Sequence, residues 1–113
     1  MRQFHHVGVI TDERQPNEIY VSETKVYVTN PNEHPYQIEY LRFEPDSPVT
    51  GPVRNQPHIA FKVPNLEQEI EGMEILLGPF QALENLKVVF VLIDGAVFEF
   101  MEFTDGSEFG EFA

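Results

Sequence analysis

The stretches that decide the fold are His6-Val7-Gly8-Val9 and His58-Ile59-Ala60-Phe61. Each reads histidine, branched apolar residue, small residue, apolar residue, and the two histidines are 58 − 6 = 52 positions apart. Alternating, β-branched segments of this kind are typical of strands. The repetition predicts a chain of two related halves, each opened by a strand that carries a histidine.

A second match closes each half. Ile38–Phe43 (Ile-Glu-Tyr-Leu-Arg-Phe) and Phe98–Phe103 (Phe-Glu-Phe-Met-Glu-Phe) both read apolar, Glu, aromatic, Leu or Met, charged, Phe. The glutamates are 99 − 39 = 60 positions apart, so the second half is 60 − 52 = 8 residues longer between its landmarks. A short helix present only in the second half would account for this difference.

Capping and turn signals indicate where the remaining elements lie. Asn65 can cap a helix that Gly72 can end, which predicts a helix between them. We expect strands at residues 4–10, 25–29, 36–44, 58–63, 74–77, 86–93 and 96–103. Residues 11–23 have no apolar stripe and are expected to form a loop. Residues 45–57 hold four of the nine prolines and are expected to form an extended linker.

These elements predict one α+β domain over residues 1–113. Length and the 42% apolar content suffice for one core. The first module would span about residues 4–46, the proline-rich linker 45–57, the second module about 58–103, and a flexible tail 104–113.

Composition excludes several classes of function. Nineteen acidic against seven basic residues give a formal charge of −12, which would repel nucleic acid and anionic membranes, so we expect neither as a partner. The absence of cysteine excludes disulfides, thiolate metal sites and cysteine nucleophiles. The N-terminus has no apolar run typical of a signal peptide, which favours a cytoplasmic location.

Strand alternation groups the histidines with small residues. His6 shares a face with Gly8, and His58 shares one with Ala60, so there is room for a bound group beside each imidazole. His5 would point to the opposite face and be structural. His34 lies in a turn and would be exposed.

The same alternation places the glutamates among apolar side chains. Glu39 shares a face with Gln37, Leu41 and Phe43, and Glu99 shares one with Val97, Met101 and Phe103. A buried carboxylate needs a partner, and a metal ion is one such partner. Glu44 and Glu102 fall on the opposite faces and would be solvated. The cleft beside the glutamates would be lined by Gln37, Phe43, Met101 and Phe103.

In their order and pairing, the two His motifs and the two Glu strands resemble the vicinal oxygen chelate superfamily, over residues 4–103. This superfamily includes glyoxalases, methylmalonyl-CoA epimerases, extradiol dioxygenases and bleomycin-resistance proteins. The resemblance implies two βαβββ-like modules, here with the first lacking its helix, in a cupped, mostly antiparallel sheet around a central cleft. It also implies four metal ligands: His6, Glu39, His58 and Glu99.

Oxygen and imidazole ligands without sulfur suit a divalent Zn, Mn, Fe, Ni or Co ion. The resemblance therefore implies a metal-dependent lyase, isomerase or epimerase that transfers a proton next to a carbonyl of a small molecule. Glu99 is the first candidate for the catalytic base and Glu39 the second.

Two other functions stay open. One is a ligand-binding or sequestering module without catalysis, as in bleomycin-resistance proteins. The other is an accessory subunit. Whatever the function, the expected absence of a helix after the first strand leaves Val7 and Val9 without a cover. A second subunit would cover them, which predicts a homodimer.

Overall fold

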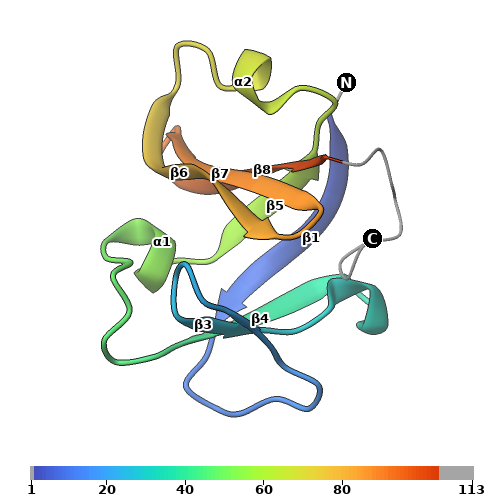
Figure 1. Cartoon of the computed structure of the whole chain (residues 1–113), viewed down its shortest axis with the longest axis vertical. Coiled ribbons are helices and arrows are strands. Elements are labelled where there is room, and N and C mark those ends of the chain that lie inside the picture. Colours follow the sequence, from blue (N-terminus) through green and yellow to red (C-terminus); the bar gives the residue numbers. More distant parts are fainter. Residues whose placement is uncertain (1, 105–113) are drawn as a thin grey trace.

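The computed structural model describes residues 2–104, and all strands in this range belong to one eight-stranded mixed sheet (Figure 1). The strands are β1 (Gln3–Ile10), β2 (Ile19–Val21), β3 (Val26–Val28), β4 (Ile38–Phe43), β5 (His58–Lys62), β6 (Glu74–Leu83), β7 (Leu86–Ile93) and β8 (Ala96–Phe103). The helices are the 3-10 turn η1 (Pro31–Glu33), α1 (Pro52–Asn55) and α2 (Leu66–Glu69). No helix in residues 2–104 has the length and apolar character needed to cross a membrane.

The strand order, β2-β3-β4-β1-β5-β8-β7-β6, repeats itself about its centre. From the centre outward, each half presents its first, fourth, third and second strand. The β1–β4 and β5–β8 pairs are parallel, and the other five are antiparallel. The prediction of a mostly antiparallel sheet is therefore confirmed.

The register at the centre is reciprocal. In the β1–β5 pair, His6 lies opposite Ala60 and Gly8 lies opposite His58. Glu39 lies beside Gly8 in the β1–β4 pair, and Glu99 lies beside Ala60 in the β5–β8 pair. The eight additional residues of the second half are accommodated by α2 together with longer second and third strands, and not by the helix alone.

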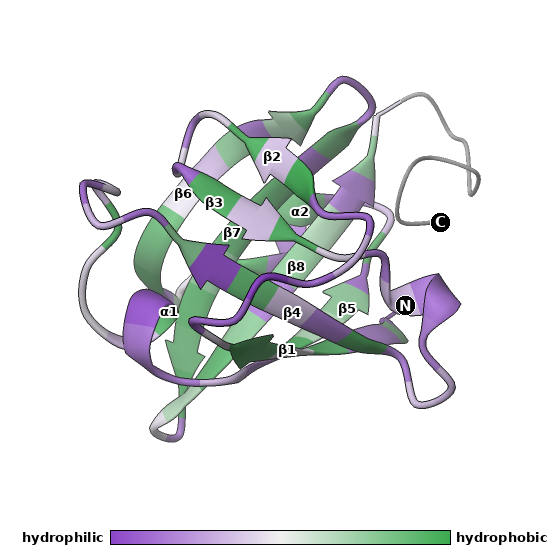
Figure 2. Ribbon diagram, turned by 90° about the horizontal axis from the view of Figure 1, so that it is seen from below, coloured by the Kyte–Doolittle hydropathy of each residue, from purple (hydrophilic) through white to green (hydrophobic). Residues whose placement is uncertain are grey.

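Side chains on the inner face of the sheet form the main core. Leu86, Val88 and Phe90 of β7 point inward and pack with valines of β2 and β3. On the outer face, Leu66 of α2 packs against Val89 and other residues of β7 and β8. Because β7 is covered on both faces, its sequence is a nearly continuous hydrophobic run and does not alternate (Figure 2).

The first half has no helix between β1 and β2, as expected, but the predicted loop at 11–23 contains the short strand β2. A three-residue strand is too short to give a periodic signal. The outer face of this half is covered by polar groups. The Arg42 guanidinium lies 4.3 Å from the centre of the Tyr27 ring and pairs with Glu18 at 2.7 Å. Val7 and Val9 on β1 are half-buried.

The linker differs from the expected extended segment, because it contains α1. Val49 and Val53 in this segment are buried against the inner core. Arg54 donates hydrogen bonds to the backbone carbonyls of Ser47 and Val49, at 3.2 and 3.1 Å. The linker is therefore folded back over the inner face of the sheet.

The second half follows the prediction more closely. The Asn65 side chain caps α2 by accepting a hydrogen bond from the Gln68 backbone at 3.0 Å. Glu102 is not simply solvated, because its carboxylate accepts a hydrogen bond from the Leu66 backbone at 2.7 Å. Strand β6 continues to Leu83, beyond the expected 74–77. Apart from Thr104, the tail expected to be flexible lies outside the described residues.

Candidate metal centre

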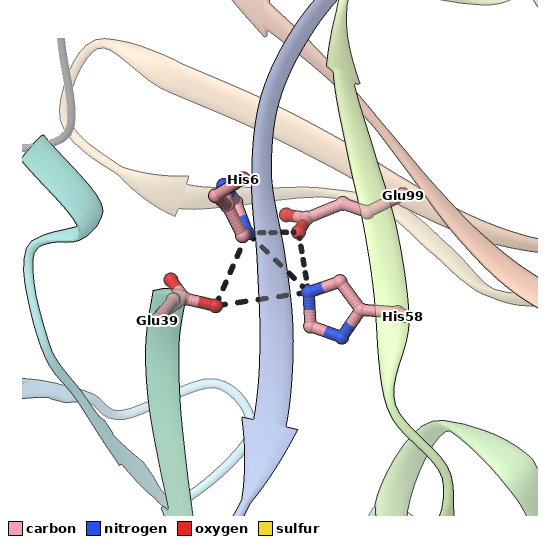
Figure 3. Close-up of side chains that lie close together, drawn as sticks. All are labelled: His6, Glu39, His58 and Glu99. Carbon is pink, nitrogen blue, oxygen red and sulfur yellow. Dashed lines mark hydrogen bonds and ion pairs between the residues drawn. The ribbon is translucent and has the colours of Figure 1, made fainter. Parts of the chain in front are cut away.

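Four buried side chains converge at the centre of the sheet: His6, Glu39, His58 and Glu99 (Figure 3). They come from β1, β4, β5 and β8, the four central strands, and each offers one ligand atom within 4.8 Å of all the others. Because side chains alternate along a strand, the register brings all four to the inner face. All four residues of the ligand set expected from the sequence are thus found together.

The spacing of the ligand atoms fits a first-row divalent cation. His6 Nε2 lies 3.2 Å from Glu39 Oε1 and 3.3 Å from Glu99 Oε1. His58 Nε2 lies 3.7 and 3.1 Å from the same two oxygens, and 3.4 Å from His6 Nε2. Ligands held about 2.0–2.2 Å from one ion are about 2.8–3.6 Å apart when they are neighbours in its coordination sphere. Four of these five distances fall in that range, and the fifth exceeds it by about 0.1 Å, so the four side chains lie close enough to hold a metal ion.

Without a cation, a proton neutralises part of the carboxylate charge. Burial alone would lower the pKa of His6, but the charges and hydrogen bonds of Glu39 and Glu99 outweigh it and raise that pKa to about 10. Burial alone would raise the pKa of Glu99, but hydrogen bonds and charges from His58 and His6 lower it to about 2. A cation binding here must displace the His6 proton.

Gly8 allows the two halves to approach. A β-carbon at this position would overlap the imidazole of His58, which lies directly against the Gly8 backbone. The room expected beside an imidazole is therefore filled by the other half's imidazole and not by a bound group. On its other side, the His58 ring meets the Phe90 ring edge to face, with centroids 5.2 Å apart. Backbone and aromatic packing together fix the direction of Nε2.

His5 is a neighbour of the site that the sequence interpretation placed on the wrong face. The β1–β5 register shifts between Phe4 and His6, and such a bulge turns consecutive side chains toward the same side. His5 is buried, and its Nδ1 lies 2.7 Å from His6 Nδ1. With Nε2 bound to a cation, His6 Nδ1 would keep its N–H and donate a hydrogen bond to His5 Nδ1. In the sequence, the adjacency of His5 and His6 was the one available signal that His5 lies beside the site.

A cavity extends from Glu39 and Glu99 into the inner core. Phe43 and Met101 line it, as expected. Gln37 does not, because it precedes β4 with a positive φ of 56° and so breaks the alternation on which its placement depended. Phe103 also lies outside the lining, at the end of β8, with its ring centroid 6.3 Å from that of His5.

Comparison with known proteins identifies a similar fold and nothing about function. No family model and no curated protein sequence matches the chain. A crystal structure of the hypothetical protein BH1468 from Bacillus halodurans C-125 is similar, with a TM-score of 0.68 and 17% sequence identity, over 96% of this chain and 99% of that one. The whole length of the fold therefore has a counterpart of known structure.

The first prediction concerns Gly8. Gly8→Ala should weaken metal binding at least about tenfold, because the new methyl group must displace the His58 ring. Changes in a residue that orients a metal ligand typically lower metal affinity about 10–100-fold. Equilibrium dialysis measures the affinity, and circular dichroism checks the fold. The matched control is Ala60→Gly at the equivalent position of β5, which removes a methyl group and should retain the affinity. Unchanged binding by Gly8→Ala would contradict the packing described.

The second prediction concerns pH. The metal-free His6 has a pKa of about 10, so it is protonated at about pH 7.5 and must lose its proton to bind a cation. Binding should release about one proton, and the affinity should rise about tenfold per pH unit until pH nears 10. Glu99 is already ionised there and adds nothing. Calorimetry in buffers of different ionisation enthalpy counts the protons released. A count near zero would contradict the protonation of His6 in the metal-free protein.

Proposed function

We propose that the protein is a divalent-metal-dependent enzyme of the vicinal oxygen chelate type, which transfers a proton next to a carbonyl of a small molecule. The observation that carries this proposal is the convergence of two imidazoles and two carboxylates, all buried, from four different strands. Buried ionisable clusters of this kind concentrate at functional sites, because they are costly to keep for stability alone.

The strand topology supports a construction from two βαβββ-like modules. In the second half, α2 lies between β5 and β6 and is followed by β7 and β8, which is the order of such a module. The first half has the same strand order without the helix. The reciprocal register of β1 and β5 relates the two proposed modules by an approximate twofold axis near Val7 and Ile59.

The cation would be held by His6, Glu39, His58 and Glu99. Two carboxylates and two neutral imidazoles together carry a charge of −2, which a divalent Zn, Mn, Fe, Ni or Co ion balances. When bound, such an ion acts as a Lewis acid that polarises a carbonyl oxygen and makes the neighbouring C–H group more acidic.

The carboxylates supply the groups that move the proton. Glu39 and Glu99 both line the cavity, so each meets a molecule bound there. Glu99, the first candidate, would accept the proton from the carbon next to the carbonyl and return it to a neighbouring carbon. Glu39 is the second candidate. The apolar surroundings exclude competing water and strengthen electrostatic interactions with the substrate.

The alternative is a module of the same fold that binds a ligand without catalysis. The absence of a helix between β1 and β2 does not leave the cavity unenclosed, because Val49 and Val53 of the linker close the inner face. Hydrogen–deuterium exchange discriminates between the two functions. An enzyme exchanges the C–H proton of a bound carbonyl compound with D2O, whereas a binding module leaves it in place.

The third prediction tests the metal centre. Elemental analysis and titration should give one divalent ion per chain, and His58→Ala should reduce the affinity at least about 100-fold by removing a ligand. His34→Ala is the matched control, since His34 lies in the turn before β4, away from the site, and should bind as the wild type does. A wild-type protein that binds no metal would overturn the proposal. Glu99→Gln provides a second variant should His58→Ala not fold.

The fourth prediction concerns assembly. We propose a homodimer through the outer face of β1 and β5, where Ile59 is 36% exposed and Phe4 is 50% exposed. Light scattering should give twice the chain mass, and Ile59→Glu should give the mass of one chain, since a buried charge opposes association. A wild-type monomer at micromolar concentration would contradict it.

A further inference from the structure

The cavity beside the candidate metal centre is small and apolar, and no basic residue in the described part of the chain lines it. From these properties we infer the substrate class. We propose that it takes a small, uncharged molecule with a short aliphatic body, whose two neighbouring oxygens lie at the Glu39 and Glu99 end. The inference rests on the proposed function for the position of the oxygens. The charge and size of the molecule follow from the cavity lining independently of that function.

The lining is almost entirely apolar. Among the described residues that line the cavity, every side chain is hydrophobic except those of Thr24, Glu39 and Glu99. The hydrophobic ones come from both halves and from the linker, including Leu41, Val53 and Phe80. Surface of this kind favours a hydrocarbon body, because their contact removes apolar area of both from water. Thr24 is the one uncharged polar residue among the described residues that line the cavity.

No basic side chain reaches the cavity. All seven Lys and Arg residues lie within the described range, and none lines it. Lys25 and Lys87 pair with surface acids, and Arg54 is hydrogen-bonded to linker carbonyls. A phosphate or carboxylate on the substrate body would enter apolar surroundings with no partner, close to two glutamates. The lining therefore selects against anionic substrates.

The cavity also limits the size of the substrate. The cavity has a volume of about 50 Å³. This volume corresponds to roughly three to five waters. A short chain of carbon atoms fits this space, while an aromatic ring or a nucleotide-bearing thioester requires the walls to move.

The experiment compares ligand pairs that differ only in charge. The protein is loaded with Co²⁺, whose visible absorption changes when ligands enter its coordination sphere. The pairs are 2,3-hexanedione against 4,5-dioxohexanoate, and 2-hydroxy-3-hexanone against 5-hydroxy-4-oxohexanoate, in which a carboxylate replaces the methyl group at the end of the chain remote from the two neighbouring oxygens. The uncharged member should bind at least about tenfold more tightly in each pair. Equal or tighter binding of the anions would overturn the inference.

The two proposals fail separately. If Co²⁺ binds but the anions are preferred, the substrate class is wrong and the metal-dependent function stands. If Co²⁺ does not bind, the metal-dependent function fails, and the same pairs are compared on the metal-free protein by ligand-observed NMR. The uncharged member is again expected to bind more tightly, because the lining is unchanged, and preference for the anion overturns the inference there too.

A variant tests whether the ligand occupies this cavity. Ala82 lines it without touching the metal ligands, so Ala82→Leu should weaken ligand binding at least about tenfold while Co²⁺ affinity stays as in the wild type. Ala96→Leu is the matched control, because Ala96 begins β8 outside the lining. Undiminished ligand binding by Ala82→Leu would place the ligand elsewhere and overturn the proposal.

Discussion

The antiparallel pairing of β1 with β5 is the interaction on which the rest of the structure depends. It sets Val7 opposite Ile59, and this alone brings the imidazoles of His6 and His58 to one face from opposite directions. The parallel neighbours of these strands then supply the carboxylates. A slip of one residue in the central pair would turn a histidine outward, because side chains alternate with a period of two. The site is therefore a consequence of strand register.

The same pairing concentrates charge in an apolar interior. Glu39 and Glu99 are 6% and 7% exposed and lie among hydrophobic residues of the inner core. Isolated carboxylates cost several kcal/mol to bury, so they need a compensating charge. The His6 proton supplies it, and a divalent cation held by the same four side chains would supply it more fully. Since these carboxylates also end the cavity, charge compensation and ligand binding share the same atoms.

The sequence predicted the site better than its surroundings. Two motifs repeated at offsets of 52 and 60, together with the resemblance they carry, were enough to bring His6, Glu39, His58 and Glu99 together as candidate ligands, because repetition constrains faces as well as strands. His5 and Gln37 were misplaced where the backbone departs from regular extension, through a bulge and a positive φ. The fold of the linker could not be predicted, since α1 has four residues and depends on the burial of Val53.

The two halves contribute equally to the ligands but unequally to the cavity. Strands β2 and β3 have three residues each, whereas β6 has ten and β7 has eight. The longer strands form one wall, and the linker closes another. The repeated positions thus carry the four side chains that could hold a cation, whereas part of the cavity lining, such as Val53 and Phe80, lies outside the repeat. Because this part of the lining is separate from the four buried side chains, it can change in this scaffold while they stay the same.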